Sequence, residues 1–78
     1  MPTAREVVFT EYALFRMHQR DIDEADVCRA LDAPSSRHTY RKDGRAEARG
    51  RLDRRGVLLV VYRRDGSTIV VINAMWER

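Results

Sequence analysis

The sequence predicts an α+β domain in which two N-terminal helices pack on one face of a four-stranded, mostly antiparallel sheet. Three observations support this fold class. Apolar residues recur at helical spacing in residues 11–31. From residue 37 onward they alternate or run continuously, as in strands. Three short turn signals divide this second part, which is typical of an antiparallel meander.

Length and composition set the class of protein. The chain has 78 residues, of which 44% are hydrophobic and 35% are charged, so we expect a single folded domain over residues 1–78. No apolar run is long enough to span a membrane, and the N-terminus lacks the apolar segment of a signal peptide. We therefore expect a cytoplasmic protein without a membrane partner. The single cysteine, Cys28, excludes an internal disulfide, and we expect neither a metal site nor a cofactor.

The first helix is predicted from Glu11 to about Arg20. Residues 6–9 precede it as a short extra strand or an extended lead-in. Thr10 can cap the helix, because its hydroxyl can accept a hydrogen bond from a free amide of the first turn. The predicted core stripe of this helix consists of Ala13, Leu14 and Met17.

The second helix is predicted to open at Asp23, with Asp26 three residues later in the manner of a capping box. Pro34 and the two serines that follow it end the helix. Its predicted core positions are Val27, Ala30 and Leu31.

Four strands are predicted after the helices, over residues 37–42, 45–52, 57–63 and 67–76, with a turn between each strand and the next. Residues 57–63 are apolar on both faces, as expected of a central strand. Residues 45–52 alternate strictly, so one face of that strand should carry a row of charges on the side away from the helices. This row consists of Arg45, Glu47, Arg49 and Arg51.

Charge is distributed unevenly along the chain. Residues 1–36 contain 4 Lys or Arg and 7 Asp or Glu, a net −3, whereas residues 37–78 contain 11 and 5, a net +6. A basic half suits a phosphate-bearing partner such as RNA. The alternative is a surface whose charge serves solubility alone.

Arg49 and Arg51 are the first candidate site residues. Two residues along a strand span about 6.6–6.8 Å, and an arginine offers a planar pair of donors to phosphate oxygens. The two side chains could therefore hold an RNA backbone, with Arg45 at the start of the strand. A bulge at Gly50 would turn Arg51 away from Arg49, and an exposed, merely soluble strand face is the alternative.

Proton transfer requires other residues. Tyr62 ends the predicted central strand and is followed by Arg63 and Arg64, so it could stack on a base or exchange a proton with a ribose hydroxyl. A core tyrosine with its hydroxyl at the rim is the alternative. His38 and His18 could each act as a general acid or base, or lie on the surface without a role.

A second stripe of the first helix contains Tyr12, Arg16 and Arg20, which are spaced by four residues. These side chains could point toward a site. Alternatively, the tyrosine is half-buried and the arginines pair with the acidic residues that follow the helix.

The segment "YALFRMHQRDI", residues 12–22, resembles the pattern H-A-x-x-R-M-x-x-R-x-I of a small bacterial domain family. The later segments "YRKDGRAEARGRL", "VLLVVYR" and "IVVINA" are similar to the rest of that family, so the resemblance covers about residues 9–74. The family in turn resembles the BrnT and RelE toxins, which are compact α+β ribonucleases of toxin–antitoxin systems. The matching positions of the first segment are Ala13, Arg16, Met17, Arg20 and Ile22.

The resemblance implies metal-independent cleavage of RNA through the ribose 2′-hydroxyl. It also implies a cognate antitoxin as partner, with ribosome-associated mRNA among the candidate substrates. Arg49 or Arg51 would contact the scissile phosphate, with Arg16 and Arg20 supporting them from the helix. The remaining implied site residues are Tyr62, Tyr12 or His38 for proton transfer, and Arg45, Arg63 and Arg78 for RNA binding.

One position departs from the family pattern. Tyr12 stands where the family usually has histidine, and an unperturbed phenol titrates near ~10, far from neutral pH. If that position transfers the proton, either the chain is inactive or His38 or His18 has taken the role. A non-catalytic RNA- or protein-binding module of the same fold is therefore the alternative function.

Overall fold

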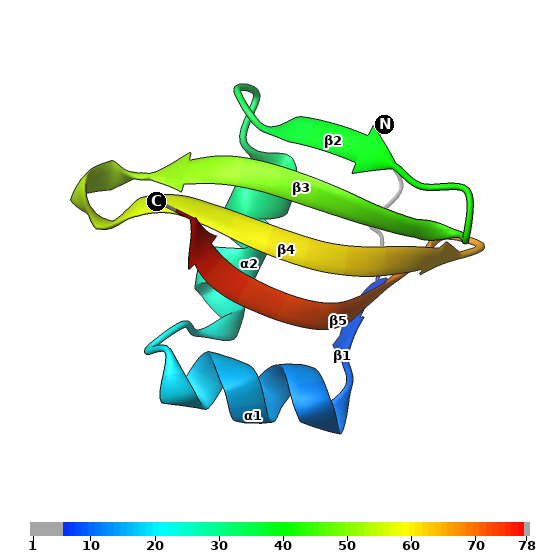
Figure 1. Ribbon diagram of the computed structural model, residues 1–78, viewed down its shortest axis with the longest axis horizontal. Helices are drawn as coiled ribbons and strands as arrows, with labels where there is room; N and C mark the ends of the chain where they lie inside the picture. Colours follow the sequence, from blue (N-terminus) through cyan, green and yellow to red (C-terminus); the bar gives the residue numbers. More distant parts are fainter. Residues whose placement is uncertain (1–5, 78) are drawn as a thin grey trace.

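The structure is a computed structural model that describes residues 6–77, and it contains one sheet with two helices on one of its faces (Figure 1). The strand order is β1-β5-β4-β3-β2. Within residues 6–77, no helix is long and apolar enough to cross a membrane. The elements in chain order are β1 (Glu6–Phe9), α1 (Glu11–Gln19), α2 (Glu24–Asp32), β2 (Arg37–Tyr40), β3 (Arg45–Leu52), a single 3-10 turn η1 (Asp53–Arg55), β4 (Gly56–Asp65) and β5 (Thr68–Glu77).

The predicted α+β class is confirmed, but the prediction of four strands in a mostly antiparallel sheet needs correction. Residues 6–9 form a fifth strand, and β1 pairs in parallel with β5, so the sheet is mixed. The apolar sequence of β1 indicated a strand but not its partner, because that partner lies about sixty residues later in the chain. The middle position of β4 in the sheet agrees with its apolar character on both faces.

Helix α1 is capped as predicted, since the Thr10 hydroxyl accepts a hydrogen bond of 3.0 Å from the amide of Ala13. Ala13 and Met17 are buried in the core, but the prediction that Leu14 faces the core is wrong, because its side chain is 40% exposed. Leu14 directly follows Ala13, and successive residues of a helix are turned by about 100° around its axis. α1 packs chiefly against one strand, β5, so only a narrow stripe of the helix is covered.

Helix α2 opens with a capping box. The Asp26 amide donates to the Asp23 carboxylate over 2.8 Å, and the Asp23 amide donates to the Asp26 carboxylate over 3.2 Å. These two bonds satisfy amides that the first turn leaves without partners. The predicted core residues Val27, Ala30 and Leu31 are all buried.

Gly50 allows α2 to lie directly on β3. A Cβ atom at this position would stand 2.7 Å from both the Cα and the carbonyl oxygen of Ala30, and 2.8 Å from the hydroxyl of Ser36. Two of these three neighbours are backbone atoms, which cannot move away without shifting the helix.

Replacing Gly50 with alanine is therefore expected to lower the free energy of unfolding by about 1–3 kcal/mol, the usual cost of overpacking a core. Thermal unfolding followed by circular dichroism measures the effect. An alanine in a strand without a clash would instead be stabilising by roughly 0.5–1 kcal/mol. An increase in the melting temperature would therefore contradict the close approach.

The C-terminal end of α1 is fastened to β5. The Arg20 guanidinium donates to the Asn73 side chain over 3.0 Å and to the Ala74 carbonyl over 2.8 Å. In return, the Trp76 indole N–H donates to the Arg20 carbonyl over 3.0 Å. The pairing of β4 with β5 shifts register between Val61 and Tyr62, at the level of this contact. β1 pairs with residues 68–71 of β5. Beyond that range, the Arg20 side chain donates a hydrogen bond to the backbone carbonyl of Ala74.

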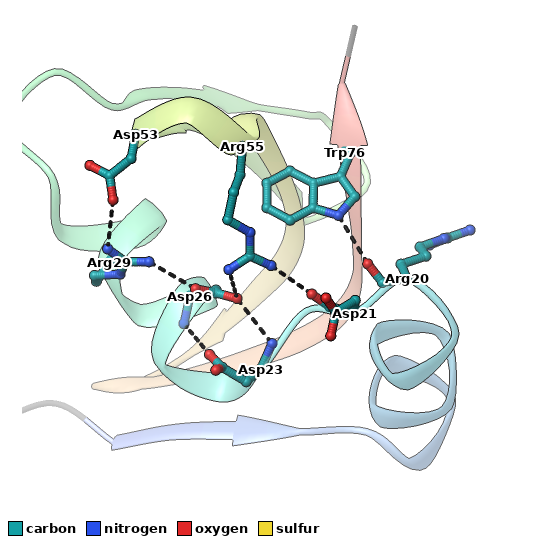
Figure 2. A network of polar contacts seen from close by, with 8 residues as sticks. All are labelled: Arg20, Asp21, Asp23, Asp26, Arg29, Asp53, Arg55 and Trp76. Carbon is teal, nitrogen blue, oxygen red and sulfur yellow. Dashed lines mark hydrogen bonds and ion pairs between the residues drawn. The ribbon is translucent and has the colours of Figure 1, made fainter.

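A network of charged residues joins α2, η1 and the turn between the helices (Figure 2). The buried Asp26 carboxylate accepts from Arg29 over 2.8 Å and from Arg55 over 3.0 Å. The Arg55 guanidinium also donates to the Asp21 carbonyl over 2.6 Å and lies 4.8 Å from the centre of the Trp76 ring. Asp53 supplies a second carboxylate, 3.5 Å from Arg29, so both arginines have an acidic partner within the network and we interpret it as a structural element.

The same contacts determine the protonation of Asp26. Burial alone would raise the pKa of its carboxyl group, but the hydrogen bond from Arg29, the backbone hydrogen bond at Asp23 and the charge of Arg55 outweigh burial and lower the pKa. The carboxylate therefore stays ionised at neutral pH and can hold both arginines.

Candidate functional site

The candidate site is built around a contact between His38 of β2 and Tyr62 of β4. The His38 Nδ1 atom and the Tyr62 hydroxyl lie 2.9 Å apart, within hydrogen-bonding distance. The two rings meet edge to face, with centroids 6.0 Å apart and an interplanar angle of 81°. Tyr62 is 3% exposed, whereas His38 is exposed. A fixed phenol therefore orients an accessible imidazole.

The two residues meet across an intervening strand. β3 lies between β2 and β4, and His38 is paired with Ala48 while Tyr62 is paired with Ala46. Neighbouring strands are about 4.8 Å apart, so a contact over two spacings requires small side chains between the partners. The two alanines of β3 provide this space.

His38 and Tyr62 line a shallow hollow of about 170 Å³ on the helix side of the sheet. Tyr40 and Arg64 line it as well, because each stands two residues from its partner on the same strand and so faces the same side. Arg64 is exposed and has no ion-pair partner within residues 6–77. Leu31 and Ile69 complete the lining.

This hollow combines groups that nucleic-acid chemistry requires. With Nδ1 bound to Tyr62, the Nε2 atom of His38 is the ring nitrogen available to accept or donate a proton. Arg64 supplies a permanent positive charge, and Tyr40, 67% exposed, offers a ring on which a base can stack. The volume suits a phosphate or ribose group and is smaller than a typical drug-sized pocket.

The predicted arginine row is present on the opposite face of the sheet. The pairing of β3 with β4 has no bulge at Gly50, so Arg49 and Arg51 share a face, as the alternation predicted. Arg63, paired with Arg45, lies on that face too. Glu47 is nearly buried there and forms ion pairs with Arg41 and Arg49.

Arg49 is the most strongly held arginine of this row. Its Nε atom donates to both carboxylate oxygens of Glu77, over 3.1 and 2.9 Å, and its Nη2 atom lies 3.3 Å from Glu47. The hydrogen bond to Glu77 is the main cause that raises the pKa of Arg49. Two carboxylates thus offset the charge that this residue was predicted to give to RNA.

The structure does not unite the predicted site residues in one place. Arg49 and Arg51 lie on the open face of the sheet, whereas Tyr62 and His38 lie on the helix face. The sheet therefore separates these arginines from Tyr62 and His38. Successive side chains of a strand point to opposite faces of the sheet, so Tyr62 and Arg63 lie on different faces and Arg64 shares the face of Tyr62.

In the predicted stripe on α1, Arg20 contacts β5, whereas Tyr12 is exposed. Arg16 is placed 5.9 Å from the centre of the exposed Tyr12 ring and donates to Gln19 over 3.3 Å. α1 contacts β5 on the helix face of the sheet, whereas the arginines of β3 lie on the open face, so Arg16 and Arg20 do not contact them. Arg78 lies outside the described residues.

His18, the other histidine, is exposed on α1 and lines a separate hollow beside Asp21, Asp23 and Arg55. In the part of the chain from residue 6 to residue 77, no group of three histidine, cysteine or acidic side chains is placed to hold a metal ion.

Tyr40 was not among the site residues predicted from the sequence, and no role was predicted for Arg64. A signal for both was present, because Tyr40 follows His38 by two residues and Arg64 follows Tyr62 by two. Residues two apart on a strand face the same side of a sheet, so this spacing places Tyr40 beside His38 and Arg64 beside Tyr62.

Comparisons with known proteins give two matches. A family model described as "Domain of unknown function (DUF4258)" matches residues 9–76. The crystal structure of the Brucella abortus ribonuclease toxin BrnT superposes with a TM-score of 0.74 at 19% sequence identity, and the match covers 96% of this chain and 99% of the toxin. At that identity the likeness establishes a shared fold. No curated protein matches the sequence.

Proposed function

We propose that this chain, which belongs to the DUF4258 family, is a toxin-like protein that acts on RNA as a metal-independent endoribonuclease. Its fold is that of a ribonuclease toxin, and this supports RNA as the substrate and an antitoxin as the partner. The observation that carries the proposal is the His38–Tyr62 pair beside Arg64, whose charge has no ion-pair partner among residues 6–77.

The proposed reaction uses the ribose 2′-hydroxyl as the nucleophile. His38 accepts the proton of this hydroxyl through Nε2, and the oxygen attacks the adjacent phosphorus. The bond to the 5′-oxygen breaks, and this oxygen takes a proton from solvent. The products are a 2′,3′-cyclic phosphate and a 5′-hydroxyl end. Arg64 offsets the charge that develops on the phosphate, and Tyr62 positions the imidazole.

The proposal is tested by incubating the purified protein with single-stranded RNA in the presence of EDTA. We expect fragments whose 3′ ends carry a cyclic phosphate, detected by mass spectrometry. The same sequence with 2′-O-methyl groups should stay intact, because the nucleophile is blocked. RNA that remains intact over a range of sequences would remove the enzymatic function.

Replacing Arg64 with alanine is expected to reduce cleavage by about 10–100-fold, since a positive charge at the developing phosphate charge is lost. Arg54→Ala provides a matched control, because it removes the same charge from an exposed residue of η1 that does not line the hollow. Rates under single-turnover conditions compare the two variants. Equal losses would show that general charge, and not the hollow, governs the reaction.

The second candidate function is a non-catalytic RNA- or protein-binding module. It is favoured by Tyr12, which replaces the usual family histidine and lies on α1, outside the hollow. This function predicts salt-dependent RNA binding, or binding to an acidic protein, without cleavage. Cleavage that appears only after Tyr12→His would support it.

A further inference from the structure

Another hollow lies on the open face of the sheet, opposite the hollow of His38 and Tyr62, and has a volume of about 460 Å³. Three arginines of β2 and β3 line it, together with Glu77 of β5. Arg37 and His38 are consecutive on β2 and therefore face opposite sides of the sheet. The full lining consists of Ser35, Arg37, Arg49, Arg51, Val57 and Glu77.

The arrangement of these arginines is unfavourable without a counter-charge. Arg37 is the direct cross-strand partner of Arg49, and Arg51 follows Arg49 by two residues on the same face. Like charges directly opposite each other in a sheet are destabilising.

The described carboxylates compensate only one of the three charges. Arg49 is held by Glu77 and Glu47. Arg37 and Arg51 are exposed, and neither has an acidic partner within residues 6–77. With three arginines and one glutamate, the lining carries a net charge of +2.

We propose that this hollow binds a backbone phosphate of single-stranded RNA through Arg37 and Arg51, with Arg49 fixed between them by Glu77. Guanidinium groups bind phosphate oxygens through two parallel hydrogen bonds, and Ser35 adds a hydroxyl at the rim. The inference rests on the proposed function and extends it, because the RNA bound here is the strand whose cleavage His38 would catalyse.

The position of β2 connects the two hollows. It is an outer strand of the sheet, and all four of its residues are exposed. A nucleic-acid strand that crosses the free edge of β2 meets Arg37 on one side and His38 on the other. A few nucleotides are enough to span this edge, so one strand can occupy both hollows.

The test measures binding separately from cleavage. The full-length protein is titrated with a fluorescent 12-nucleotide RNA whose riboses all carry 2′-O-methyl groups, which block cleavage. Arg37→Ala and Arg51→Ala are each expected to weaken binding by about three- to tenfold. Each should also reduce the slope of log affinity against log salt by about 0.7, the value for one phosphate contact on a single strand.

Arg54→Ala is the matched control, because Arg54 is exposed on η1, carries the same charge and does not line the hollow. It should change the affinity by less than twofold. If Arg37→Ala and Arg51→Ala weaken binding no more than Arg54→Ala does, the inference is overturned. An acidic protein whose binding depends on these arginines, while RNA binding does not, would overturn it as well.

The two proposals fail in distinguishable ways. Binding that depends on Arg37 and Arg51, with unmodified RNA left intact, supports the phosphate site and removes the ribonuclease. Cleavage that depends on His38, with binding indifferent to Arg37 and Arg51, supports the ribonuclease and removes the phosphate site.

Discussion

Replacing His38 with glutamine is expected to lower the rate of RNA cleavage by about 10²–10⁴-fold, the usual contribution of a general acid or base. Glutamine can keep a hydrogen bond to Tyr62, but it cannot take up a proton from the 2′-hydroxyl. The measurement is kcat/KM for an RNA oligonucleotide at several pH values. We expect the loss at every pH value at which the wild type cleaves RNA.

His18→Gln is the control for this substitution, because His18 is exposed on α1 and lies outside the hollow. It should leave kcat/KM within about twofold of the wild-type value. Tyr62→Phe keeps the buried ring and removes only the hydroxyl, so it tests the positioning role of Tyr62. A lower kcat/KM is expected, with a fall in melting temperature of no more than roughly 10 °C for one lost hydrogen bond. Equal activity of the His38→Gln variant and the wild type would refute the assignment.

Replacing Asp26 with alanine is expected to lower the free energy of unfolding by about 2–4 kcal/mol, which combines a lost helix cap with two lost charge-assisted hydrogen bonds. The loss stays below that of a fully buried ion pair, because the side chains of Arg29 and Arg55 are 52% and 42% exposed and regain water. The melting temperature should fall by roughly 10–30 °C for a domain of this size.

Glu24→Ala is the control, since Glu24 is exposed in the same first turn of α2. It should change the stability by no more than about 0.5 kcal/mol. Similar losses in the two variants would show that acidic charge near the helix start, and not the network, stabilises the fold.

The lowered pKa of Asp26 gives this prediction a pH dependence. A carboxyl group whose pKa is lower in the folded than in the unfolded state stabilises the fold above the unfolded value of about 3.9. That contribution is lost as the pH falls through the folded value. The stability gap between the wild type and Asp26→Asn should therefore narrow below about pH 4. A gap that stays constant from pH 7 to pH 2 would contradict the assignment.

Local chemistry was sufficient to predict much of the fold. The Thr10 cap, the box at Asp23 and the alternation of residues 45–52 each depend on residues close together in the sequence, and all three are present in the structure. Leu14 was misplaced because the width of a buried stripe depends on how much sheet the helix meets. The parallel pairing of β1 with β5 was missed because no local pattern specifies a distant partner.

The candidate site was harder to predict than the fold. His38 and Tyr62 were both considered, but separately, because they lie on strands that are not neighbours. Their contact depends on the small side chains of Ala46 and Ala48. Alanine has no reactive group, so nothing in the sequence indicated that these two residues shape the site. The arginine row was predicted from its alternating charges. The ion pairs of Arg49 were not predicted, because one of its partners, Glu77, lies on the distant strand β5.

The docking of β1 and α1 on β5 also has a consequence for synthesis. β5 lies far C-terminal to β1 and α1 in the sequence, so the ribosome makes the surface that receives both elements well after the elements themselves. Until then Ala13 and Met17 have no sheet to cover, and the long-range pairing cannot begin. Docking of β1 and α1 should therefore wait until β5 has been synthesised, and a chain that stops before β5 should leave both elements undocked.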